Sequence, residues 1–142
     1  MKIKKIQEEI IDEFAMFDDW MQRYEYMIDL GKSLPLIDSK YKTDDYLVSG
    51  CQSKVWVRAE LMDKQIVFKA DSDAIISKGI IAILIRVFSH HEPNEIIEAK
   101  TDFIDKIGLK DHLSPNRANG LSSMIKQLKI YALAYQTKIN NE

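Results

Sequence analysis

Apolar residues recur every three or four positions over much of the chain, the spacing typical of helices with one buried face. The first such stretch places Ile3, Ile6, Ile10, Phe14 and Phe17 on one face. Four further helices are predicted, with Asp18 as N-cap of the first and Ser114 as N-cap of the last. The first of these follows Asp18 and runs to Leu30, with Gly31 as the stop. The other three run from about Asp73 to Phe88, from Pro93 to Ala99, and from Pro115 to about Thr137.

The predicted helix that ends at Phe88 is apolar around most of its circumference, which is typical of a helix buried on all sides. We expect it to lie across a sheet as the centre of the core. Gly79 in its interior costs about 1 kcal/mol relative to alanine, so we expect a close contact there. Asp71 and Asp73 precede the helix and are expected to cap it.

Period-2 alternation of apolar and polar residues marks the strands. Val55 to Leu61 alternates cleanly, Ile66 to Ala70 follows a turn, and Tyr46 to Val48 is a shorter strand-like run. The pattern predicts an α+β fold in which a small, three-stranded antiparallel sheet is packed by several helices. With 46% hydrophobic residues, the chain can bury a core as one domain over residues 1–142.

The turn between the first two predicted strands holds Cys51, the only cysteine among 142 residues. Gly50 allows a sharp turn, and the side chains of Gln52 and Ser53 can hydrogen-bond a thiolate, with Lys54 adding positive charge. A free cysteine is commonly a small buried hydrophobe without chemistry. The polar neighbours favour a thiol presented to a partner, but the pattern alone leaves both interpretations open.

Composition narrows the class of protein. The net charge is −2 with 30% charged residues, and no block of like charge predicts a nucleic-acid partner. No apolar run approaches the roughly 20 residues of a membrane span, and the amino terminus has no apolar segment typical of a signal peptide. A lone reduced thiol suits the cytoplasm, where we expect the protein to act.

Three ordered motifs resemble those of the SufE-type cysteine desulfuration proteins, the SufE/CsdE family of sulfur acceptors in iron–sulfur cluster assembly. They are Gly50-Cys51-Gln52-Ser53 with Val55-Trp56, Asp71-Ser72-Asp73-Ala74 with Lys78-Gly79, and Ser114-Pro115 with Arg117 and Asn119-Gly120-Leu121. Trp20, Tyr24 and Leu30-Gly31 also fit. The resemblance spans essentially the whole chain and departs at Asn119, where some relatives have glutamine. It implies a SufE/IscU-like fold.

The resemblance also implies a function. Cys51 accepts persulfide sulfur from a pyridoxal-phosphate-dependent cysteine desulfurase of the SufS type, stimulates that enzyme, and passes the sulfur to an iron–sulfur scaffold. The chain itself then needs no cofactor and is not an enzyme. Gly50, Gln52 and Ser53 form the supporting loop, which the Asp71 to Asp73 loop adjoins. Asp71, Asp73 and Arg117 are candidates for the partner surface, although close helix packing with a solvated Arg117 explains the third motif equally well.

Three rival functions remain open at the level of sequence. An IscU-like scaffold needs about four cluster ligands, mostly cysteines, and the chain has one. A cysteine-nucleophile hydrolase needs a histidine base, but His90, His91 and His112 stand in no recognisable motif. The third rival is an interaction module with an incidental cysteine. We predict no metal site, because adjacent histidines on a helix point apart and no acidic or cysteine cluster completes a zinc-like ligand set.

Overall fold

A computed structural model describes residues 2–141. Within that range the chain forms six α-helices, one two-stranded sheet and three short 3₁₀ turns. In chain order the elements are α1 (Ile3–Ala15), α2 (Trp20–Lys32), the turns Ser39–Tyr41 and Asp44–Tyr46, β1 (Val55–Met62), β2 (Gln65–Ser72), α3 (Ile75–Phe88), α4 (Pro93–Glu98), α5 (Phe103–Lys106), the turn Lys110–His112, and α6 (Pro115–Asn140).

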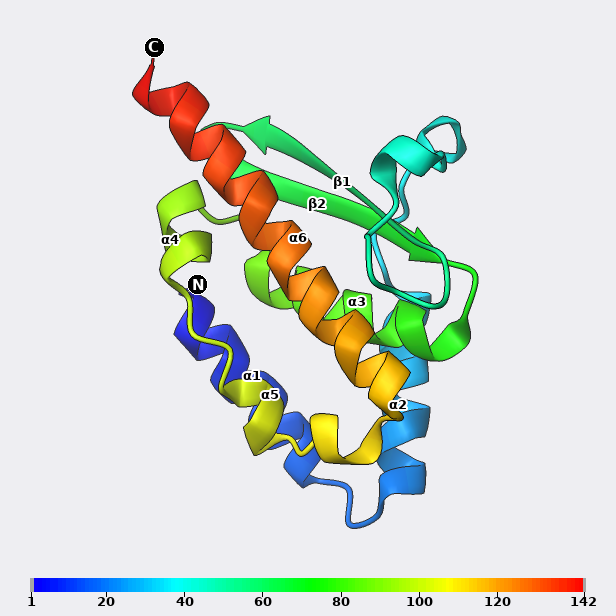
Figure 1. The fold of residues 1–142 in the computed structure, drawn as a ribbon. Helices are drawn as coiled ribbons and strands as arrows, with labels where there is room; N and C mark the ends of the chain where they lie inside the picture. The colour runs from blue at the N-terminus through cyan, green and yellow to red at the C-terminus, as the bar shows by residue number, and fades with distance from the viewer. Residues whose placement is uncertain (1, 142) are drawn as a thin grey trace.

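Helix α3 lies at the centre of the core, as its sequence predicts. Ten of its 14 residues are buried, including Ile81 and Leu84, which are fully enclosed. It contacts α1 and α2, the strand β2, and the long helix α6 (Figure 1). The buried face of the hairpin supplies Val55, Val57 and Phe68 to the same core. Because α3 contacts both β2 and α6, the hairpin and the long helix pack against the same central helix.

The predicted third strand is absent from the described residues, so the sheet has two strands rather than three. Asp44 to Tyr46 form a 3₁₀ turn, and Leu47 makes only an isolated bridge to Trp56. The Val48 N–H donates to the Val55 carbonyl oxygen at 2.8 Å, and the chain then turns away. The apolar character of the run Tyr46 to Val48 reflects the burial of Val48 in the core. A residue can be buried in this way without pairing in a sheet.

Strands β1 and β2 pair antiparallel from Val55 opposite Ser72 to Met62 opposite Gln65. Asp63 and Lys64 both have positive φ, as a two-residue hairpin turn requires. Two tyrosines of α6 tie that helix to the far edge of β1. The Tyr131 hydroxyl donates to the Val57 carbonyl oxygen at 2.8 Å, and the Tyr135 hydroxyl donates to that of Ala59 at 2.9 Å. These hydroxyls satisfy backbone acceptors that an edge strand would leave exposed.

Two glycines allow α2 and α3 to cross closely, which confirms the contact expected at Gly79. A Cβ added there would lie 2.5 Å from the Met27 carbonyl oxygen. A Cβ added at Gly31 would lie 3.1 Å from the Gly79 nitrogen. The prediction that Gly31 ends α2 is therefore wrong, since the helix continues to Lys32 and its N-cap is Asp19 rather than Asp18.

The expected cap of α3 is also wrong. Its N-cap is Ala74, and no side chain caps it. Asp73 instead accepts the Lys54 N–H at 3.0 Å, and Asp71 binds two lysines. Neither carboxylate accepts a backbone N–H of the first turn of α3: Asp73 binds the cysteine-loop backbone, and Asp71 binds the side chains of Lys42 and Lys78. The Ser72 hydroxyl accepts the Ala74 N–H at 3.2 Å.

Candidate functional site

The cysteine loop, residues 49–54, connects Val48 to β1 and lies against α6. Gly50 has a φ of +93°, a conformation that side chains with a Cβ rarely adopt. A Cβ at this position would also lie 2.4 Å from the Ser123 hydroxyl oxygen. Glycine is thus needed both for the turn and for the close approach, and both bring the following residue onto the helix.

The Cys51 side chain is turned inward and half-buried. Its thiol lies 3.5 Å from the Gly120 carbonyl oxygen of α6 and is placed to donate a weak hydrogen bond to it. A Cβ on Gly120 would lie 3.5 Å from the Cys51 sulfur, an ordinary van der Waals contact, so a side chain here would cover the sulfur without clashing with it. Burial raises the pKa of Cys51 above its ordinary value.

The neighbours of Cys51 do not act on the thiol as the sequence suggested. The Gln52 side-chain oxygen accepts a hydrogen bond from the Asn116 amide at 3.1 Å and so fastens the loop to α6. The Lys54 backbone hydrogen-bonds the side chains of Ser72 and Asp73, which lie where β2 ends and before α3 begins. The expectation that these residues favour the thiolate is therefore replaced by an upward shift of the Cys51 pKa from burial.

A cavity of about 310 Å³ opens beside Cys51. It brings Cys51, Gln52 and Ser53 together with Arg117, which sequence alone could not place. The other lining residues come from α3 and from the start of α6 and its cap: Ser77, Ile80, Ser114, Asn116, Gly120 and Met124. Hydroxyl, amide and guanidinium groups thus surround a space next to the sulfur, a setting that suits a polar or anionic sulfur species.

Asp73 holds the carboxyl-terminal end of the cysteine loop. Besides accepting the Lys54 N–H, it donates its own N–H to the Lys54 carbonyl oxygen at 3.2 Å. The Ser72 hydroxyl donates to the same carbonyl oxygen at 2.8 Å. The structure therefore places Ser72 and Asp73 beside the cysteine loop, as the resemblance implied, although Asp71 and Ser72 are the last residues of β2 rather than part of a loop.

Asp71 is buried and does not line the Cys51 cavity. Its carboxylate pairs with Lys42 at 2.5 Å and with Lys78 at 3.3 Å. Burial alone would raise the pKa of Asp71, but hydrogen bonds from Lys42, the Ser72 N–H and Lys78 outweigh it, so the pKa is lowered. These contacts join the segment before β1 to β2 and α3. Asp71 therefore stabilises the elements around the site and does not itself contact the Cys51 cavity.

The sequence did not identify Asn116, Ser123 or Ser77 as site residues, although Asn119-Gly120 within a helical pattern gave a signal at Gly120. The three histidines lie elsewhere, and no histidine is among the described residues that line the Cys51 cavity. His112 stacks on Trp20, with ring centroids 3.9 Å apart. Across residues 2–141, no group of three or more histidine, cysteine or acidic side chains is placed to hold a metal ion.

The family model described as "SufE: Fe-S metabolism associated domain" matches residues 8–132. The chain belongs to the SufE family. It is 42% identical over 127 residues to an uncharacterized SufE-like protein of Rhizobium meliloti, covering 86% of this chain and 91% of the relative. A SufE-like protein of Arabidopsis thaliana, named as chloroplastic/mitochondrial, is 37% identical over 132 residues, which cover 92% of this chain and 36% of that longer protein.

A solved structure supports the fold independently. The solution structure of a hypothetical protein from Thermus thermophilus matches with a TM-score of 0.77, over 93% of this chain and 96% of that one. At 16% sequence identity this likeness concerns the fold alone. No helix within residues 2–141 is both long and apolar enough to cross a membrane. The family connects this SufE protein with iron–sulfur metabolism.

Proposed function

We propose that this SufE protein accepts sulfur from a pyridoxal-phosphate-dependent cysteine desulfurase of the SufS type and carries it as a persulfide on Cys51. One observation carries the proposal: the only thiol of the chain lies on a glycine turn beside a polar cavity. The pyridoxal phosphate belongs to the desulfurase, and the carrier brings no cofactor or reaction of its own. Its action is to receive sulfur, which also stimulates the partner enzyme.

The transfer step is a thiol–disulfide-type exchange. The Cys51 thiolate attacks the outer sulfur of the persulfide held on the desulfurase cysteine. A new S–S bond forms at Cys51, the old one breaks, and its electron pair leaves with the enzyme thiolate. No oxidant or reductant is consumed. Passing the sulfur to an iron–sulfur scaffold repeats the exchange, and a single cysteine avoids resolving the persulfide into an internal disulfide.

The inward position of Cys51 suits the resting carrier, because a shielded thiol of raised pKa is a poor nucleophile at neutral pH. Between its two ends, the cysteine loop is fastened by the Cys51–Gly120 and Gln52–Asn116 contacts. Its ends are held more firmly, by the Val48–Val55 hydrogen bond and by the contacts of Lys54 with Asp73. We infer that the cysteine loop has two states, with Cys51 turned inward in the free protein and outward in the complex. The desulfurase favours the outward state because it binds that state more tightly.

The partner surface in this proposal centres on the cysteine loop and on exposed groups beside it. Arg117 is exposed on the first turn of α6 and lines the same cavity, so it can reach either the partner or a negatively charged persulfide. Asp73 is exposed at the other end of the loop. The free thiol of Cys51 is kept reduced in a compartment such as the cytoplasm, where the protein is expected to act. Reductants there would cleave an exposed persulfide, so the sulfur needs a protected path between donor and acceptor.

The test is stimulation of a purified SufS-type desulfurase, measured as alanine released from cysteine. We expect the wild-type protein to accelerate turnover and Cys51→Ser to give none, while both show the same circular dichroism spectrum. Lys126→Ala, which alters an exposed residue of α6 outside the three motifs and outside the cavity lining, is the control and should stimulate normally. Stimulation by Cys51→Ser in the absence of reductant would contradict the carrier role.

A further inference from the structure

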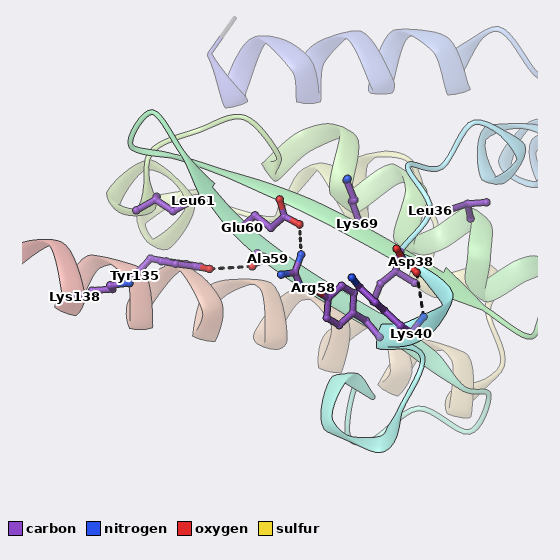
Figure 2. A pocket seen from close by; sticks show the side chains of 12 residues that line it. Leu36, Asp38, Lys40, Arg58, Ala59, Glu60, Leu61, Lys69, Tyr135 and Lys138 are labelled. Carbon is purple, nitrogen blue, oxygen red and sulfur yellow. Dashed lines mark hydrogen bonds and ion pairs between the residues drawn. The ribbon is translucent and has the colours of Figure 1, made fainter.

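A second cavity, of about 730 Å³, lies along β1, and it shares no lining residue with the Cys51 cavity. Its side chains come from three parts of the fold, as Figure 2 shows. The segment before β1 contributes Asp38 and Lys40, the strands contribute Arg58 and Lys69, and the end of α6 contributes Lys138. We call this cavity the β1 groove.

The β1 groove carries an excess of positive charge. Four basic side chains line it against two carboxylates, although the whole chain has a net charge of −2. Glu60 is already ion-paired with Arg58. The ammonium groups of Lys40 and Lys69 make no ion pair with any residue of the described chain, 2–141. Lys138 likewise makes no ion pair within residues 2–141, so three cations without an ion-pair partner line the groove.

The groove also presents apolar and aromatic surface. The Arg58 guanidinium lies 4.0 Å from the centre of the Tyr41 ring, and the Lys40 ammonium lies 5.1 Å from it. Leu36, which also lines the groove, is 55% exposed. A small inorganic anion would use the cations and leave this surface unfilled. A segment that has both carboxylates and apolar side chains would use both.

The edge of β1 determines how such a segment can bind. Alternate residues of β1 direct their backbone N–H and carbonyl groups away from β2. Val55 and Val57 belong to this set, because their carbonyl oxygens accept hydrogen bonds from Val48 and Tyr131, which lie outside the hairpin. Ala59 belongs to that set, and its carbonyl oxygen is already occupied by the Tyr135 hydroxyl. Addition of a strand to this edge is therefore blocked at Ala59, so a ligand has to be recognised by side chains.

We propose that the β1 groove docks an acidic, partly apolar segment of a partner protein through Lys40, Lys69 and the Tyr41–Leu36 surface. The groove is separate from the cysteine loop, so one partner can be held here while Cys51 is free for exchange. The proposal does not depend on sulfur transfer.

The probe is a short fluorescent peptide of alternating glutamate and leucine, titrated by fluorescence anisotropy at low salt. We expect saturable binding to the wild-type protein and a loss of about tenfold in affinity, roughly 1.4 kcal/mol, for Lys40→Glu/Lys69→Glu. The matched control, Lys5→Glu/Lys126→Glu, makes the same change in net charge at exposed helix positions outside the groove and should bind nearly as wild type.

Several outcomes would overturn the proposal. They are no binding to the wild-type protein, equal weakening by both double variants, and equal binding of a glutamate–serine peptide, which would reduce the groove to a simple anion site. Competition by inorganic pyrophosphate as strong as that by unlabelled peptide would have the same meaning. Cys51→Ser should bind the peptide unchanged, so failure of the groove and failure of the sulfur-carrier proposal can be told apart.

Discussion

The Cys51 thiol and the Gly120 carbonyl oxygen lie 3.5 Å apart, although 69 positions separate them in the chain. This contact ties the cysteine loop to α6. Glycine is costly within a helix, but a Cβ at Gly120 would only come into ordinary contact with the sulfur, at 3.5 Å. The absence of a side chain at Gly120 leaves the sulfur next to backbone and to the polar cavity.

Gly120→Ala tests this relationship. The added methyl group makes an ordinary contact, 3.5 Å from the sulfur, and alanine favours a helix by about 0.5–1 kcal/mol over glycine. We expect the free energy of unfolding in urea to stay equal or rise, while alkylation of Cys51 by iodoacetamide slows because the sulfur is covered further. Faster alkylation in this variant would show that the inward contact is not the resting state.

Gly50→Ala should destabilise the protein by about 1–3 kcal/mol, because alanine is strained at a φ of +93° and its Cβ would lie 2.4 Å from the Ser123 hydroxyl oxygen. The measurement is urea unfolding. Ser123→Ala removes the clashing oxygen but not the backbone strain, so the double variant should recover only part of the loss. Full recovery would mean that steric overlap alone requires this glycine, and no loss would contradict the described loop conformation.

The raised pKa of Cys51 has a consequence for stability. The pKa of this thiol is higher in the folded than in the unfolded state, so the unfolded protein loses the proton first as pH rises. The contribution of the thiol to the free energy of unfolding is therefore intact below the unfolded pKa and is lost as pH rises through the folded pKa. The free energy of unfolding of the wild-type protein, relative to Cys51→Ser, should therefore fall on the alkaline side of about pH 8.5. A difference that is flat through alkaline pH, or rises, would contradict a desolvated thiol.

Asp71 gives the opposite dependence. Its pKa is lowered in the folded state, so the stability it contributes is present above the unfolded pKa and is lost as pH falls through the folded pKa. Asp71→Asn should cost about 1–3 kcal/mol at pH 7, because the contacts to Lys42 and Lys78 are lost. Urea unfolding should show the gap between the two proteins closing in acid. A gap independent of pH would mean that shape, not charge, explains the cost.

Hydrophobic periodicity predicted the helices and strands well where the periodic apolar residues are also the buried ones. The centre of the core at α3 and the close contact at Gly79 both followed from residues near each other in the chain. Gly31 was misassigned because a glycine that ends a helix and a glycine that lets two helices cross look alike in sequence. Tyr46 to Val48 was misassigned because burial of a short apolar run resembles a strand.

The site was predictable only in part for a similar reason. Cys51 and its polar neighbours stand together in the sequence, so the loop could be recognised as a unit. The Gly120 contact, the Asn116–Gln52 hydrogen bond and the cavity around Arg117 depend on how α6 packs over the loop. Such non-local packing has no periodic signature, and only the unusual Asn119-Gly120 pair within a helix pointed to it.

Amide hydrogen exchange tests the proposed movement of the loop. Binding of a SufS-type desulfurase should change exchange in residues 49–53 and in the adjoining residues 71–73, because the Lys54–Asp73 contacts join the two segments. The α1 helix, on the other side of α3, should exchange as in the free protein. Protection confined to a distant face, with residues 49–53 and 71–73 both unchanged, would contradict the two-state loop.

The most direct test of the central claim is the intact mass of the protein after incubation with a purified SufS-type desulfurase, cysteine and pyridoxal phosphate. The account predicts one added sulfur atom on the wild-type chain, mapped to the peptide containing Cys51, released by reductant, and absent from Cys51→Ser. An unmodified wild-type chain in a reaction where the desulfurase turns over, or added sulfur on Cys51→Ser, would contradict it.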